Sequence, residues 1–283
     1  MDPVRWHSHP RLRRPMMVVA FEGWNDAADA ASTAIDHLAR TCQAEAFASI
    51  DPEEFFDFTA TRPRARIDAD LNRSIEWPGN ELLAAHRPDG PHDLVLLSGT
   101  EPNLRWRTFA EAIVGIAVEL GVQMTVSLGA LLADVAHTRP VRVTGTAADG
   151  ELAERLHLRR SRYEGPTGIL GILSDSLGRA GIPTASLWAA VPHYVSQTPS
   201  PKAALALLER ASSIIGVPPD ALDLQIASSS YERQVTDLVQ ADPDVAEYVA
   251  QLERDEPEAD GITMTAGESL AEEVERFLRE HGK

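Results

Sequence analysis

The stretch from Met16 to Ala31 constrains the fold more than any other part of the chain. An apolar run of strand type at 16–21 ends in a polar turn at 22–26, and an alanine-rich helical pattern at 26–40 follows. We expect Asn25 or Asp26 to cap this helix, because a short polar side chain can accept a hydrogen bond from a free N–H of the first turn. Proteins of the α/β class place ligands at such turns. Every βαβ unit also needs a turn and a cap. This segment is therefore either a ligand site or a purely structural turn.

Strand-like and helical patterns alternate up to about residue 200. Strand patterns occur at 16–21, 44–50, 64–68, 74–77, 93–98, 123–128, 141–146 and 182–190. Helical patterns occur at 26–40, 108–120, 151–158, 169–179 and 202–215. Continuous apolar runs such as 94–97 are typical of strands buried on both faces. We therefore predict an α/β fold with a largely parallel central sheet and flanking helices. The segments at 64–68 and 74–77 are joined by a polar turn and predict a hairpin.

The character of the sequence changes after Pro199. Helical patterns follow at 202–215, 222–240, 245–254 and 268–280, without a strand pattern between them. The last of them carries an apolar stripe made of Leu270, Val274, Phe277 and Leu278. The charged segment at 254–261 is typical of a linker. We therefore divide the chain into an N-terminal segment at 1–15, an α/β domain at 16–200 and a helical C-terminal subdomain at 201–283.

Charge and composition narrow the class of protein. The formal net charge is −17, from 26 basic and 43 acidic residues, which argues against binding to nucleic-acid phosphates. No run approaches the roughly 20 apolar residues that a membrane span needs. The single cysteine, Cys42, excludes an intrachain disulfide and a cysteine-based zinc site. The first residues lack the apolar core of a signal peptide. We therefore expect a cytoplasmic protein with neither a nucleic-acid nor a membrane partner.

Small and polar residues follow four of the predicted strands. In open parallel sheets the carboxyl ends of the strands meet at one edge, and ligands bind there. We therefore expect a candidate crevice whose residues are Glu22, Gly23, Trp24, Asn25, Asp26, Ser98, Gly99, Thr100, Glu101, Gly129, His137, Arg139, His193 and Tyr194. A large aromatic side chain at the mouth of such a crevice either covers a ligand or holds a subunit contact.

The sequence contains no complete catalytic or metal-binding motif. Ser98 lacks the Gly-x-Ser-x-Gly pattern of a nucleophile elbow and is expected to cap a turn. His137 and His193 could act as acid or base near neutral pH, although a hydrogen bond to the backbone is the commoner role in a loop. Segment 163–168 (YEGPTG) lacks the Lys of a phosphate loop, and Thr167 is expected to cap the next helix. We assign no catalytic residue, metal or cofactor, and the balance favours a protein that is not an enzyme.

Five segments together resemble the proteasome assembly chaperone family, in the domain type named after its second chaperone. They are 21–31 (FEGWNDAADAA), 98–106 (SGTEPNLRW), 129–140 (GALLADVAHTRP), 163–168 (YEGPTG) and 186–194 (SLWAAVPHY). The resemblance covers roughly residues 16–235 and is strongest up to Leu208. The chain resembles the actinobacterial branch of the family, whose members carry a helical C-terminal extension.

This resemblance implies a fold similar to that of purine nucleoside phosphorylases and a tendency to form homo-oligomers. It also implies a role in building the proteasome core particle, whose subunits would be partners. Archaeal relatives that bind the proteasome ring end in a hydrophobic-Tyr-any motif that docks between ring subunits. Residues 281–283 are His-Gly-Lys, so docking by that device is not expected.

Two other functions stay open at this point. The phosphorylase-like fold suggests a binding protein, hydrolase or phosphorylase for a nucleoside-like small molecule, using Glu22, Trp24, Asn25, Glu101 and His193. Alternatively, the chain is a structural homo-oligomer that buries Trp24 and Trp106 at subunit contacts. The helical subdomain would be either a lid over the crevice or an arm that contacts a neighbouring subunit.

Overall fold

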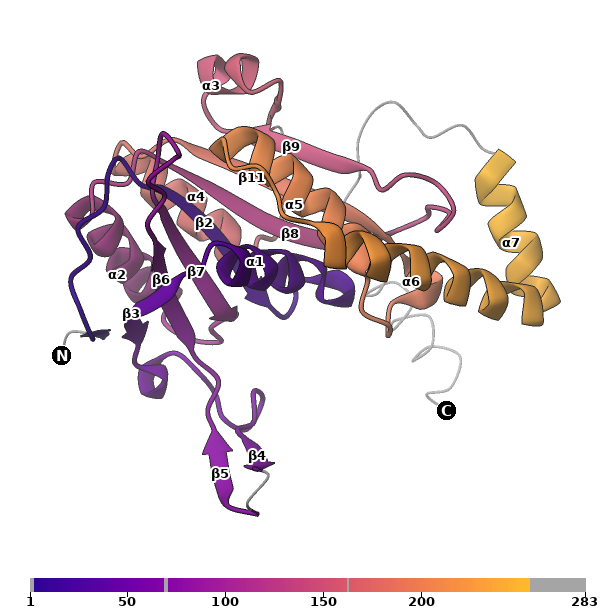
Figure 1. The fold of residues 1–283 in the computed structure, drawn as a ribbon, viewed down its shortest axis with the longest axis horizontal. Helices are drawn as coiled ribbons and strands as arrows, with labels where there is room; N and C mark the ends of the chain where they lie inside the picture. Colours follow the sequence, from indigo (N-terminus) through magenta and orange to yellow (C-terminus); the bar gives the residue numbers. More distant parts are fainter. Residues whose placement is uncertain (1–2, 69–70, 162, 255–283) are drawn as a thin grey trace, which may run out of the picture.

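The computed structural model describes residues 3–68, 71–161 and 163–254, and its centre is a nine-stranded sheet (Figure 1). The strand order is β1-β3-β6-β7-β2-β8-β11-β9-β10. Four central strands run parallel to one another: β7 (Leu94–Thr100), β2 (Met16–Glu22), β8 (Met124–Ala133) and β11 (Thr184–Pro192). The continuous apolar runs of β2 and β7 are buried, as strands covered on both faces must be. The prediction of a parallel central sheet is confirmed.

Further strands flank this parallel centre on both sides. Beside β7 lie three strands in antiparallel succession: β6 (Asn80–Ala85), β3 (Glu45–Ile50) and β1 (Val4–Trp6). Beside β11 lies antiparallel β9 (Val143–Ala147), followed by parallel β10 (Arg159–Arg160). The sequence did not predict β6, because its residues include no β-branched or aromatic side chain. Part of the expected N-terminal segment forms the edge strand β1.

Helices cover both faces of the sheet. One face carries α1 (Ala30–Thr41) and α5 (Pro201–Ile215), which pack on each other and share an apolar core with β2 and β8. The other face carries α2 (Trp106–Glu119) and α4 (Ile169–Arg179), which share a second core with β2, β7 and the phenylalanines Phe47 and Phe55. The short helix α3 (Gly150–Arg155) lies beside β9 and β10.

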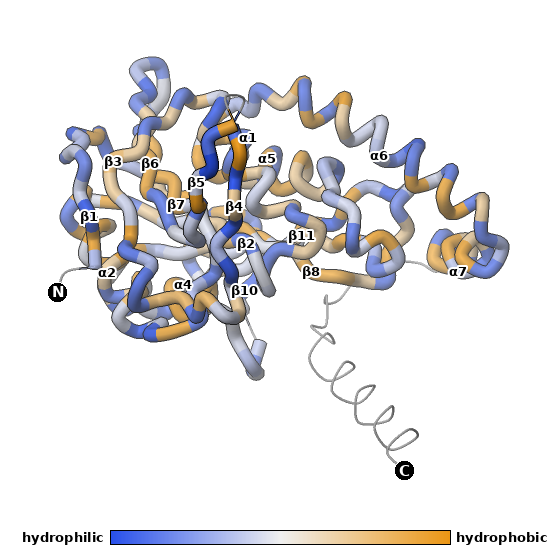
Figure 2. Tube along the Cα trace, turned by 90° about the horizontal axis from the view of Figure 1, so that it is seen from below, coloured by the Kyte–Doolittle hydropathy of each residue, from blue (hydrophilic) through white to orange (hydrophobic). Residues whose placement is uncertain are grey.

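Two further helices extend from the body along α5 (Figure 1). Helix α6 (Leu222–Ala241) packs on α5, and α7 (Pro243–Arg254) packs on α6. Hydrophobic and hydrophilic residues alternate along α6 in Figure 2, and the apolar residues Tyr231, Val235 and Val239 join a third cluster with Val249 of α7. The predicted helix at 268–280, and the expected linker beyond Arg254, lie outside the described residues.

Strands β4 (Arg64–Ile67) and β5 (Arg73–Glu76) form a separate antiparallel hairpin that projects from the body (Figure 1). This confirms the predicted hairpin. No helix within residues 3–68, 71–161 and 163–254 is long and apolar enough to cross a membrane.

Candidate functional site

The carboxyl ends of β2 and β7 lie side by side and begin the first cluster of predicted site residues. Glu101 N donates to Glu22 O at 2.9 Å, which extends the pairing of the two strands. Gly23 turns the chain with φ of 122°, a left-handed conformation that favours glycine. An added Cβ at Gly23 would lie 3.3 Å from Glu101 Cβ. The turn leaves Trp24 55% exposed, so this ring faces solvent instead of covering the strand ends.

Asn25 and Glu101 join the strand ends to the start of helix α4. The side chain of Asn25 is buried, and its Nδ2 donates to Glu101 Oε1 at 2.8 Å. The same carboxylate oxygen accepts from Ile169 N, in the first turn of α4, at 3.0 Å. Negative charge at a helix N-terminus is favourable because the free N–H groups there carry partial positive charge. Gly168 precedes α4 without a side-chain cap, so the prediction that Thr167 caps this helix is wrong.

Gly168 is required by this arrangement. A Cβ added there would lie 2.6 Å from Asn25 Oδ1 and 2.9 Å from Glu101 Oε1, closer than real Cβ atoms approach such groups. The backbone of Gly168 therefore fills the space beside both side chains. Asn25 Oδ1 is left buried without a hydrogen-bond partner in the described part of the chain.

Asp26 fixes the start of helix α1 from a distance. Its carboxylate accepts from Ala31 N at 2.5 Å and from Ser32 N at 3.2 Å, as expected of a side chain that satisfies the first turn, although the N-cap residue of α1 is Asp29. The predicted helix start at residue 26 is wrong, because α1 begins at Ala30. Between them Ala28 and Asp29 adopt left-handed φ of 52°, which bends the chain so that the carboxylate reaches the free N–H groups. Burial raises the pKa of Asp26 to about 6, against the lowering effect of the hydrogen bonds from Ser32 and Ala31.

Three other predicted site residues belong to the sheet itself. Ser98 lies inside β7 and donates to Asp36 Oδ1 of α1 at 3.0 Å, so the prediction that it caps a turn is wrong. At Gly99 an added Cβ would lie 2.2 Å from Gly79 O. Glycine is needed there because the backbone of Gly79 approaches so closely. Thr100 N donates to the same carbonyl at 3.0 Å. These residues hold β6, β7 and α1 together.

Strands β8 and β11 run further than predicted, and a second cluster lies where they end. Gly129 lies within β8, and an added Cβ would lie 2.8 Å from the Trp188 ring of β11. Past the strand ends, His193 Nδ1 lies 3.0 Å from Asp134 Oδ1. Tyr248 of α7 donates from its hydroxyl to the same oxygen at 2.9 Å.

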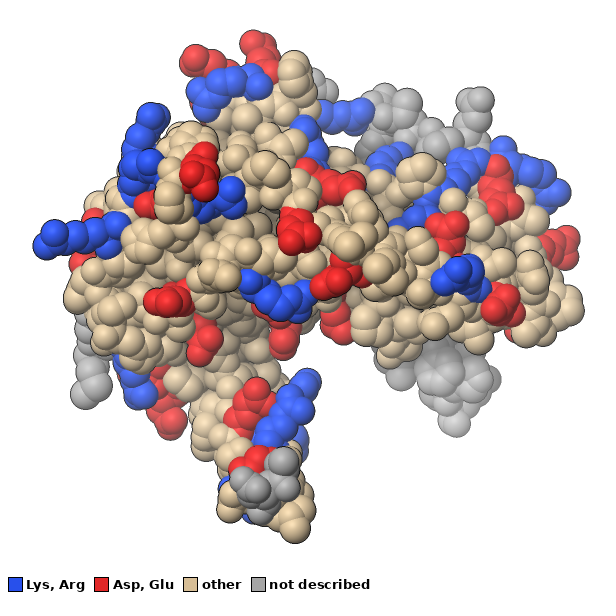
Figure 3. Space-filling model, viewed as in Figure 1, with Lys and Arg blue, Asp and Glu red and all other residues tan. Residues whose placement is uncertain are grey.

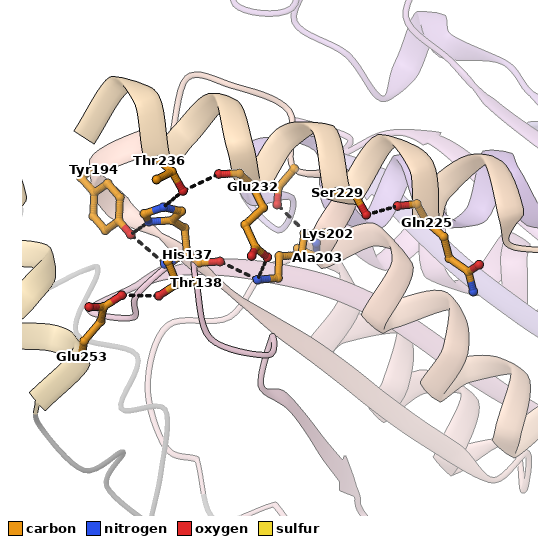
Figure 4. A network of polar contacts seen from close by, with 11 residues as sticks. His137, Thr138, Tyr194, Lys202, Ala203, Gln225, Ser229, Glu232, Thr236 and Glu253 are labelled. Carbon is orange, nitrogen blue, oxygen red and sulfur yellow. Dashed lines mark hydrogen bonds and ion pairs between the residues drawn. The ribbon is translucent and has the colours of Figure 1, made fainter. Parts of the chain in front are cut away.

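His137 is the centre of a polar network that joins this loop to helix α6 (Figure 4). Thr236 donates to the Glu232 carbonyl oxygen at 2.8 Å, so it must accept from His137 Nε2 at 3.0 Å. The neutral ring then accepts at Nδ1 from the Tyr194 hydroxyl, 2.8 Å away, and that hydroxyl also accepts from His137 N. Burial, followed by the positive charge of Lys202, lowers the pKa of His137 below its ordinary 6.5. The network therefore holds the ring neutral.

Charged contacts complete the second cluster. Lys202 Nζ donates to the carbonyl oxygen of His137 and to Glu232 Oε2, both at 2.5 Å. Arg139 donates to the backbone oxygen of Glu253 in α7, and Thr138 donates to the Glu253 carboxylate at 2.5 Å. These contacts attach α6 and α7 to the loop after β8. Sequence inspection missed Lys202, Glu232, Thr236, Tyr248 and Glu253; the helical spacing of Glu232 and Thr236 was the available signal.

The structure thus places eight of the fourteen predicted crevice residues in two separate clusters. The first joins Glu22, Gly23, Asn25 and Glu101 to α4, and the second joins His137, Arg139, His193 and Tyr194 to α6 and α7. The side chains of Asn25 and Glu101 in the first cluster, and of His137 and Tyr194 in the second, are hydrogen-bonded within the chain. Over residues 3–68, 71–161 and 163–254, no group of three or more His, Cys, Asp and Glu side chains is arranged to hold a metal ion.

Comparison with known proteins identifies the fold and the family. The sequence model of the PAC2 family matches residues 20–239. The chain belongs to the PAC2 family. A PAC2 family protein from Streptomyces avermitilis is 48% identical, over 83% of this chain and 99% of that one, with a TM-score of 0.77. The family match begins within β2 and ends in α6, so it takes in the first cluster and the part of the second cluster that precedes α7.

Two further solved structures are similar to this chain. A proteasome-assembly chaperone homologue from Mycobacterium tuberculosis is 44% identical, over 83% of this chain and 99% of that one, with a TM-score of 0.75. PbaB of Pyrococcus furiosus, an archaeal proteasome activator, is 18% identical over 84% of this chain and 99% of that one, with a TM-score of 0.68. The archaeal likeness shows the fold alone. A search of curated proteins finds no match.

Proposed function

We propose that this PAC2 protein acts in the cytoplasm by binding other proteins, and that it assists assembly of the proteasome core particle. The observation that carries the proposal is that Glu101 Oε1 accepts hydrogen bonds both from Asn25 and from the first turn of α4. The polar side chains at the ends of β2 and β7 are thereby used to join elements of the fold. A catalytic role needs groups that face a substrate, whereas protein binding uses the outer surface.

Family membership supplies the second line of support. The chain is 44% identical to a protein described as a proteasome-assembly chaperone homologue, over nearly all of that protein. The exposed ring of Trp24, beside the first cluster, suits a protein contact, because tryptophan is enriched where protein interfaces are most tightly packed.

The test mixes the purified chain with the α and β subunits of the core particle from the same organism. We expect the chain to co-migrate with subunits or with half-assembled particles, and to change the rate at which peptidase activity appears. Trp24→Ala is the informative variant, and Glu22→Ala, at a neighbouring exposed position, is its control. No binding and no change in assembly rate would refute the proposal.

One observation favours the small-molecule alternative. Asn25 Oδ1 is buried and has no partner among the described residues, and a buried unpaired acceptor is costly unless something donates to it. A bound ligand with an N–H or O–H group would satisfy it. A thermal-shift screen of nucleosides and related metabolites tests this alternative. Stabilisation of wild type that is lost in Asn25→Ala would support it, and no shift with any compound would reject it.

A further inference from the structure

The β4–β5 hairpin has one apolar face and one charged face. Its register pairs Ala65 with Ile75, and side chains alternate along each strand, so Ala65, Ile67 and Ile75 share one face. We call these three residues the apolar hairpin face. The opposite face carries Arg66 and Glu76, whose Nε and Oε2 atoms lie 2.7 Å apart. Such alternation is typical of a strand pair that buries one face and exposes the other.

The chain as described leaves the apolar hairpin face in solvent. Ile67 is 67% exposed and Ile75 is 46% exposed, and every residue of both strands is classed as exposed. The hairpin stands off the body, and Figure 3 shows basic and acidic side chains on its surface at the bottom of the view. A two-stranded hairpin on its own is marginally stable in water. Its pattern therefore specifies a buried face, and nothing in the described part of the chain covers that face.

The base of the hairpin is held firmly, which suits a docking element. The rings of Phe58 and Trp77 meet edge to face with centroids 4.8 Å apart. Asn103 Oδ1 accepts from Asp57 N and from the Thr61 hydroxyl, both at 3.0 Å. The hairpin thus projects in a fixed direction, and less conformational entropy is lost when it docks.

We propose that the apolar hairpin face docks on helix α6 of a second copy of this chain. A second copy suits the hairpin because helix α6 carries exposed apolar side chains and negative charge that complement the hairpin. Leu222 and Ile226, one helical turn apart on α6, are 61% and 60% exposed, and the exposed Asp223 lies between them in sequence. Arg73 shares the apolar hairpin face, opposite Ile67, and would lie against this acidic helix. Residues 222–254 hold seven acidic and two basic residues, so the receiving arm is negative where the hairpin is rich in arginine.

The geometry favours contact between two chains over contact within one. In Figure 1 the hairpin projects below the body, whereas α6 extends to the right. A hairpin that docks on α6 of the next copy makes a head-to-tail contact, and repetition of such a contact closes a ring when the rotation permits. A second copy is always present at the same concentration as the first. The marginally stable hairpin therefore always has this partner available.

The experiment measures the mass of the full chain in solution by sedimentation and light scattering over a range of concentrations. Wild type should be larger than the 30.8 kDa monomer. Ile75→Asp should weaken self-association by at least about tenfold, because it places a charge at the centre of a buried contact. Ser74→Asp is the matched control: it adds the same charge one residue away, on the opposite face. Both positions are exposed in the single chain, so the circular dichroism spectra of both variants should match wild type.

A mixing experiment tests the receiving surface. Ile226→Asp should also abolish larger assemblies, and a mixture of the Ile75→Asp and Ile226→Asp chains should form a dimer, because each retains one intact half of the contact. A monomeric wild type, an Ile75→Asp chain that associates like wild type, or equal effects of Ile75→Asp and Ser74→Asp would each overturn the proposal. Failure of the mixture to form dimers would overturn docking on α6. The assay contains no proteasome subunit, so its result is independent of the function proposed above.

Discussion

Replacement of Glu101 by alanine tests whether the first cluster stabilises the fold. The substitution removes the acceptor for Asn25 Nδ2 and for Ile169 N, and it leaves the Asn25 amide buried. Each hydrogen bond to a charged group contributes about 1.5–3 kcal/mol. Glu101 is partly exposed, so we take the lower end for both and expect Glu101→Ala to cost about 3 kcal/mol. For a chain of this size, that loss lowers the melting temperature by roughly 6–12 °C.

Urea denaturation and thermal melting of three variants measure this loss of stability. Glu101→Gln keeps an oxygen that can accept both hydrogen bonds without the charge, so it should lose about half as much stability. Glu22→Ala removes the neighbouring exposed carboxylate and should change stability by about 0.5 kcal/mol or less. If Glu101→Ala were no more destabilising than Glu22→Ala, the cluster would not stabilise the fold, and the argument against a ligand site at these strand ends would lose its basis.

Three further predictions concern Gly168, Asp26 and His137. Gly168→Ala should cost about 1–3 kcal/mol in urea denaturation, because its Cβ would collide with Asn25 and Glu101; an unchanged midpoint would contradict the close packing. Folding raises the pKa of Asp26 from 3.8 to about 6, so its contribution to stability falls as pH rises from about 4 to 6, by about 3 kcal/mol. Asp26→Asn should remove that slope. The pKa of His137 is lowered on folding, so stability should fall as pH drops through 6.5, and His137→Asn should flatten this part of the melting-temperature profile.

The elements that were predictable from the sequence are those with a strong local pattern. The apolar run of β7 and the hairpin at β4 and β5 were found because periodicity and turn residues are properties of neighbouring positions. The pairing of Asn25 with Glu101 spans 76 positions, and that of His137 with Thr236 spans 99. The acceptor for Ile169 N was missed for the same reason, since it is Glu101, which follows β7, and not Thr167.

The segments that resemble the family can now be interpreted through the distant contacts that their residues make. Segments 21–31, 98–106 and 163–168 carry the resemblance, and they supply Asn25, Glu101 and Gly168, whose contacts start α4 at the ends of β2 and β7. A chain needs those residues to build this fold, whatever it binds. The resemblance therefore indicates a shared fold before it indicates a shared function. The hairpin lies outside those segments, and its alternating pattern is not needed by the body of the molecule. A residue pattern that the fold does not need is most simply explained by a partner, so Ile75→Asp tests a partner contact more directly than any change at the strand ends.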